Sequence, residues 1–175
     1  MIIPKADAIL ETKNLNTQSQ ETKSETPIKV AKKPRTSQNR RKSRELVLKA
    51  VYRGMINASA LKQIIADAKE DPEYGKADEA YFRHLLEGVT SKVEELDSQV
   101  SAFIDRKIEE LSPVEHAILR ISSFELMFDS TIPYRVAINE GVELAKLYGG
   151  ADGHKYINGV LDKVAAAVRP QEFRR

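Results

Sequence analysis

Hydrophobic residues recur at helical spacing along the chain from about residue 45 onward. Apolar positions three and four residues apart place their side chains on one face of an α-helix. Seven such stripes occur, and they cover residues 47–54, 61–68, 82–89, 93–104, 114–128, 136–145 and 157–168. No segment alternates at period two. The pattern therefore predicts an all-α domain of about seven helices that pack as antiparallel neighbours.

The fifth stripe begins with a clear helix-start signal. Ser112, Pro113 and Glu115 have the order of a capping box, in which the serine caps the helix, the proline takes its first position and the glutamate its third. The helix that follows, to about Phe128, is apolar on most of its circumference. Such a helix is expected at the centre of the fold, with the other helices packed around it.

Composition divides the chain into three parts. Residues 1–38 are rich in Thr, Ser, Lys, Asn, Gln and Pro without helical or strand periodicity, so we expect a disordered N-terminal extension. Residues 39–170 form the predicted helical domain, and residues 171–175 form a C-terminal tail.

The charge distribution is uneven although the formal net charge is only +2. Residues 1–44 carry 11 Lys and Arg against 4 Asp and Glu, whereas residues 45–175 carry 17 against 22. The basic extension ends in a cluster, residues 40–44, at the start of the first helix. Guanidinium groups bind phosphates in a bidentate and salt-dependent manner, which favours nucleic-acid binding. The alternative is a solvated tail that only adds solubility.

A second candidate site is the loop of residues 149–156, which leads into the last helix. Free backbone N–H groups at a helix start suit a phosphate, Lys155 adds positive charge, and Tyr156 can stack on an unpaired base. The alternative is that Asp152 caps the helix and Tyr156 is half buried in the core. The glycines of this loop match no nucleotide-binding motif.

The sequence offers no catalytic or metal-binding constellation. Cysteine is absent, and the histidines His84, His116 and His154 are about 30 residues or more apart, without metal-ligand spacing. No signal peptide and no apolar run of 18 residues is found. We therefore expect a cytoplasmic protein without a membrane segment, without cofactor or metal, and without enzymatic activity.

Four runs of the sequence resemble the bacterial transcription antitermination factor NusB family. They are Ala-Tyr-Phe-Arg-His-Leu-Leu-Glu-Gly-Val at 80–89, Pro-Val-Glu-His-Ala-Ile-Leu-Arg at 113–120, and the longer runs at 133–146 and 154–163. The resemblance covers roughly residues 40–170. It implies the NusB-like bundle of about seven helices in two small helical subdomains.

The resemblance also implies a function. Members of this family bind the boxA element of ribosomal RNA transcripts together with NusE, a small-subunit ribosomal protein. The pair joins the elongating RNA polymerase complex with other Nus factors and suppresses premature termination. The family's RNA-binding positions correspond here to Arg40, Arg41, Lys42, Arg44, Tyr52, Asp152, Lys155 and Tyr156.

This chain departs from the family pattern at three places. Gly141 stands where the family usually has alanine, which weakens a helix by roughly 1 kcal/mol unless close packing uses the gap. Phe124 stands where tyrosine is more common, and the N-terminal extension is longer. An alternative function is a stand-alone helical RNA-binding or adaptor module, related to the targeting domain of ribosomal RNA methyltransferases. A purely structural adaptor with a solubilising arm is the third possibility.

Overall fold

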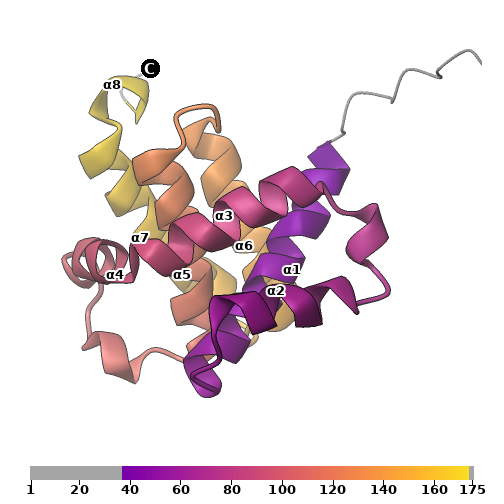
Figure 1. Cartoon of the computed structure of the whole chain (residues 1–175). Coiled ribbons are helices and arrows are strands. Elements are labelled where there is room, and N and C mark those ends of the chain that lie inside the picture. Colours follow the sequence, from indigo (N-terminus) through magenta and orange to yellow (C-terminus); the bar gives the residue numbers. More distant parts are fainter. Residues whose placement is uncertain (1–36, 174–175) are drawn as a thin grey trace, which may run out of the picture. The chain divides into compact units, whose positions relative to one another are not determined.

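The computed structural model describes residues 37–173 as an assembly of helices (Figure 1). The α-helices are α1 (Ser37–Ile56), α2 (Leu61–Lys69), α3 (Glu79–Ser91), α4 (Val93–Ser101), α5 (Pro113–Phe128), α6 (Tyr134–Tyr148), α7 (Gly153–Val168) and α8 (Pro170–Phe173). Two 3-10 turns, η1 (Tyr74–Lys76) and η2 (Ile108–Glu110), precede α3 and α5. No strand occurs within the described residues. The predicted all-α class is confirmed.

Each predicted stripe lies within one of the helices α1 to α7, except the fourth, which runs past the end of α4. The apolar spacing predicts a helix through Ile104, whereas α4 ends at Ser101. Phe103 and Ile104 follow in a turn and still pack against the core, so the apolar spacing outlasts the helix. Residues 1–36 lie outside the described part, so their predicted disorder stays a prediction, whereas Ser37 and Gln38 of the predicted extension form the start of α1.

Helix α5 lies at the centre of the fold, as its apolar circumference predicts. It contacts α1, α3, α4, α6 and α7. Nine of its residues are buried, among them the polar Ser122, Ser123 and Glu125. Helices α2 and α3 pack on α1 on one side of α5, and α6 and α7 pack on each other and on α5 (Figure 1). Both groups share α5 and belong to one compact unit.

Both ends of α5 are capped by side chains. At its start, the Ser112 hydroxyl accepts a hydrogen bond from the Glu115 N–H at 3.2 Å, with Pro113 in the first turn. This is the serine half of the predicted capping box. At its end, the buried Arg169, which follows α7, donates to the carbonyl oxygens of Glu125 and Leu126 at 2.7 and 2.8 Å. The end of α7 therefore supplies hydrogen-bond partners for the last turn of α5.

Gly141 lies where α6 closely approaches side chains of α5 and α7. A Cβ atom at this position would overlap the Ser122 hydroxyl oxygen and lie 3.0 Å from Leu161 Cδ1. The missing side chain is therefore used for close helix packing, which offsets the low helix propensity of glycine.

None of the helices within residues 37–173 has the length and apolar character that a membrane-spanning helix requires.

Candidate nucleic-acid interface

The basic cluster at the start of α1 divides into exposed and buried residues. The side chains of Arg40, Arg41 and Lys42 are 43%, 48% and 26% exposed. The side chain of Arg44 is only 4% exposed. The first three can reach a ligand in solution. The guanidinium of Arg44 is buried, so this structure does not place Arg44 where it could make the predicted contact with RNA.

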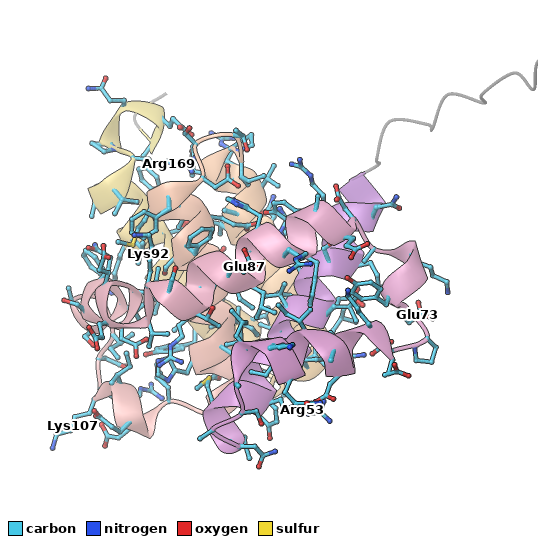
Figure 2. All side chains as sticks on the ribbon, in the orientation of Figure 1. Arg53, Glu73, Glu87, Lys92, Lys107 and Arg169 are labelled. Carbon is cyan, nitrogen blue, oxygen red and sulfur yellow. The ribbon has the colours of Figure 1, made fainter. Side chains whose placement is uncertain are left out.

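The three exposed cations have carboxylate partners on neighbouring elements. Arg41 makes a bidentate pair with Glu140 of α6, with Nε–Oε2 at 3.0 Å and Nη2–Oε1 at 2.9 Å. Its pKa is raised by that hydrogen bond and by the attraction of Glu140. Lys42 Nζ lies 2.8 Å from Glu45 and 3.5 Å from Glu73, which Figure 2 labels on the connection between α2 and α3. Exposed ion pairs contribute at most about 1 kcal/mol, so phosphate groups can replace these carboxylates.

Arg44 belongs to a buried polar cluster between α1, α3 and α5. Its Nε donates to Glu125 Oε1 at 2.8 Å, and its Nη2 donates to the Tyr81 hydroxyl at 3.3 Å. The Tyr81 hydroxyl in turn donates to the same Glu125 oxygen. Burial raises the pKa of Glu125 against the attraction of Arg44, and burial also raises the pKa of Tyr81. These three residues join the helices and do not face a ligand.

Tyr52 lies on the same face of α1 as Arg41, eleven residues further along, which is roughly 16 Å along the helix axis. Its side chain is 40% exposed and lines an open groove of about 530 Å³ between α1 and α2. Two ion pairs join α1 to residues in or just after α2 along this groove: Lys49–Asp71 at 3.1 Å and Arg53–Asp67 at 3.0 Å.

The first turn of α7 and the residue before it present two charged side chains to solvent. Asp152 and Lys155 are 82% and 74% exposed, and Lys155 Nζ lies 3.3 Å from the Asp152 carboxylate. Asp152 precedes the first residue of α7, but its side chain accepts no capping hydrogen bond. The alternative that Asp152 is a side-chain cap is therefore not supported.

Tyr156 lies in the first turn of α7 and is partly buried against the core. Its hydroxyl donates to Asp105 Oδ1 at 3.3 Å, and the guanidinium carbon of Arg106 lies 4.5 Å from its ring centroid. Arg106 also pairs with Asp105 at 2.8 Å. Sequence reasoning missed Arg106, because about 50 residues separate it from Tyr156 and no spacing rule connects them. The structure adds Arg106 as a cation at this end of the candidate surface.

Residues 41–166 match the profile of the NusB family. This chain belongs to the NusB family.

Sequence relatives support the assignment to this family, and they align with this chain over most of their length. It is 59% identical over 142 residues to the transcription antitermination protein NusB of Methylobacillus flagellatus, an alignment that covers 81% of this chain and 92% of the relative. It is 50% identical over 135 residues to the protein of the same name from Thiobacillus denitrificans, covering 77% of this chain and 93% of the relative.

Solved NusB structures share the fold. The T. maritima NusB structure superposes with a TM-score of 0.68 at 29% identity and covers 78% of this chain and 97% of that chain. A chain from a crystal structure of antitermination factors NusB and NusE in complex with dsRNA gives a TM-score of 0.67 at 26% identity, covering 75% and 99%. The implied NusB family membership is confirmed.

In this NusB chain the predicted RNA-binding residues form two groups. One lies on α1 and comprises Arg40, Arg41, Lys42 and Tyr52. The other lies at the start of α7 and comprises Asp152, Lys155 and Tyr156. The first group combines exposed positive charge with the exposed Tyr52, and the second combines it with the partly buried Tyr156, whereas Arg44 lies beneath the first group.

Proposed function

We propose that this chain is a transcription antitermination factor that binds boxA RNA of ribosomal RNA transcripts together with NusE. In this proposal the complex joins the elongating RNA polymerase with other Nus factors. The protein acts in the cytoplasm as a binding and positioning factor without a catalytic step of its own. Family membership supports this proposal, and so does the existence of a solved NusB–NusE complex with dsRNA.

The observation that carries the proposal is the pairing of cations with tyrosines in both groups. On α1, Arg40, Arg41 and Lys42 can each bind a phosphate oxygen, and Tyr52 lies further along the same helix. Cations that neutralise phosphates supply affinity for any RNA strand, whereas aromatic side chains stack on bases that are not paired. The combination offers contacts to unpaired bases in addition to those with phosphates.

The second group has the chemistry to read an unpaired base. The ring of Tyr156 already carries the Arg106 guanidinium at stacking distance, and planar guanidinium groups themselves stack on bases. We propose that Tyr156 and Arg106 together form a stacking platform. Lys155 adds charge beside it at the exposed start of α7.

NusE is proposed as the protein partner on chemical grounds as well as on family grounds. Residues 45–175 carry 22 Asp and Glu against 17 Lys and Arg, so the helical body is acidic. A ribosomal protein that is basic complements such a body electrostatically.

A titration of fluorescent boxA RNA and of a scrambled RNA of equal length, with and without NusE and at two salt concentrations, tests this function. We expect boxA RNA to bind more tightly and NusE to widen the difference. The variant Arg41→Ala should weaken both RNAs, and Tyr156→Ala should weaken boxA RNA more than the scrambled RNA. Arg135→Ala, which removes an exposed arginine of α6, is the matched control and should bind like the wild type.

Equal binding of the two RNAs, lost on raising the salt, would contradict the proposal. It would mean that only nonspecific charge attraction acts.

A further inference from the structure

The start of α3 holds the first turns of α1 in place. The backbone N–H of Asp78 donates to the Asn39 carbonyl at 3.2 Å, and the Ser43 hydroxyl donates to the Asp78 carbonyl at 2.7 Å. Asp78 Oδ1 also accepts a hydrogen bond from the Tyr81 N–H at 3.1 Å and so caps α3. These bonds tie the turn of α1 that carries Arg40 to the turn of α3 that carries Tyr81.

The guanidinium of Arg40 lies over the Tyr81 ring. Its central carbon is 4.7 Å from the ring centroid, and its Nε is 3.9 Å from Asp78 Oδ2. A guanidinium at this distance is attracted by the negative face of the ring. The Arg40 side chain remains 43% exposed, so part of the group still faces solvent.

Tyr81 is itself held firmly. It is only 5% exposed, and its hydroxyl is hydrogen-bonded to Glu125 of α5 and to Arg44 of α1. Arg44 also contacts the ring, with its guanidinium carbon 5.2 Å from the centroid. The ring is therefore a fixed support on which Arg40 rests.

We propose that Tyr81, together with Asp78, is a positioning residue of the RNA-binding surface. It does not touch RNA but holds the Arg40 guanidinium in the orientation in which it meets a phosphate. A free arginine loses rotamer freedom on binding, and a support that restricts the side chain beforehand lowers that entropic cost. This inference rests on the proposed RNA binding by α1.

A double-mutant cycle in RNA binding tests the inference. The variants Arg40→Ala, Tyr81→Leu and the double variant are titrated with boxA RNA, at a temperature at which circular dichroism shows each to be folded. Tyr81→Leu should weaken binding by about two- to tenfold in the wild-type background and should have no further effect when Arg40 is absent. Tyr81→Phe keeps the ring and should bind RNA like the wild type, although it loses the hydrogen bond to Glu125.

The outcomes separate the inference from the function on which it rests. If Arg40→Ala weakens binding but the Tyr81→Leu effect is additive with it, Tyr81 acts only on stability, and the inference is overturned while the function stands. If Arg40→Ala leaves RNA binding unchanged, the proposed RNA surface at this end of α1 fails as well.

A measurement on the wild-type protein avoids any loss of fold. The ring current of Tyr81 should shift the NMR signals of the Arg40 side-chain protons upfield, and the shift should persist when boxA RNA is added. A shift that disappears on RNA binding means that Arg40 leaves the ring to bind, which contradicts the inference.

The matched control for the Tyr81 variants is Tyr134, whose ring also carries a guanidinium, that of Arg135, at 5.6 Å. Tyr134→Leu should leave RNA affinity unchanged.

Discussion

Arg41 and Arg44 lie less than one turn apart on α1, yet their removal has different consequences. Arg44→Ala leaves Glu125 buried without its positive partner, and we expect the free energy of unfolding to fall by about 3 to 5 kcal/mol. Arg41→Ala breaks an exposed pair and should change that free energy by at most about 1 kcal/mol. It should, however, reduce the salt dependence of RNA binding, d log K/d log[salt], by about 0.7 to 0.9. Urea unfolding and salt titrations measure the two effects.

The opposite pattern would contradict this assignment. A stable Arg44→Ala protein with a reduced salt slope would mean that Arg44 contacts RNA directly.

The two arginines show how far the sequence could predict the site. Arg44 is three and seven residues before Val47 and Val51, so helical spacing already puts it on the buried face. Its charge and its place in a basic run favoured an exposed role instead. Its partner Glu125 lies 81 residues away, and no local pattern connects the two. Contacts of this kind depend on how helices pack and could not be predicted from spacing.

Gly141 allows a second test with single residues. Alanine at this position gains about 1 kcal/mol of helix propensity but overlaps the Ser122 hydroxyl, and overpacking of this kind costs about 1 to 3 kcal/mol. We expect Gly141→Ala to lower the thermal midpoint or leave it unchanged. Adding Ser122→Ala should relieve the overlap and make the double variant more stable than Gly141→Ala alone. If Ser122→Ala has the same effect in both backgrounds, the two positions are not in steric conflict.

The end of α5 is held by a side chain from the end of α7. Its last turn contains no basic side chain, and Arg169 donates hydrogen bonds to the carbonyl groups of Glu125 and Leu126 there. Further bonds from the same guanidinium reach the carbonyls of Asp129 and Ile132 in the connection to α6. In Figure 2, Arg169 lies where α7 meets α8. A single side chain thus fixes the end of α5 and the path into α6.

Arg169→Ala should therefore destabilise the protein by about 3 kcal/mol or more, since several buried carbonyl groups lose charged donors. Arg169→Lys keeps the charge but lacks the planar fork, so it should recover only part of the loss. Urea unfolding of the three proteins measures this. If the lysine variant is as stable as the wild type, charge alone acts, and the fork geometry is not required.

Element boundaries were predictable where the sequence carries a start signal and less so where packing decides. The Ser112 and Pro113 signal gives the start of α5 correctly. The end of α4 does not follow from the apolar pattern, because Phe103 and Ile104 pack on the core from a turn. An apolar stripe shows which residues are buried, and buried residues can continue past the end of a helix, as Phe103 and Ile104 do.

At the scale of the whole molecule, acid stability depends in part on Asp97, which joins α4 to α5. Burial alone would raise the pKa of Asp97, but hydrogen bonds from Arg120 and His116 outweigh it and hold the pKa at about 2. Because this pKa lies below the value of about 3.9 for an unfolded aspartate, Asp97 stabilises the fold above about pH 4. The contribution, about 2 kcal/mol, is lost as the pH falls toward 2.

Asp97→Asn should accordingly be less stable than the wild type at pH 5, and the difference should shrink by pH 2.5. Urea midpoints at the two pH values test this. Glu94→Gln removes an exposed carboxylate from the same helix and is the control, with a small effect at both pH values. If the stability difference between Asp97→Asn and the wild type is the same at both pH values, the charge of Asp97 does not cause that difference.

The carboxylates around the start of α1 have a consequence for selectivity. Glu140, Glu73 and Glu45 are attached to the fold, so they act as tethered competitors for Arg41 and Lys42 at a high effective concentration. A polyanion that offers only phosphate groups must displace these carboxylates from the cations. It then lies close to the negative charge of the displaced carboxylates. An RNA whose bases also stack on the tyrosines gains binding energy that this competition does not oppose. If α1 binds RNA as proposed, these carboxylates favour RNA with unpaired bases over polyanions that offer phosphate groups alone.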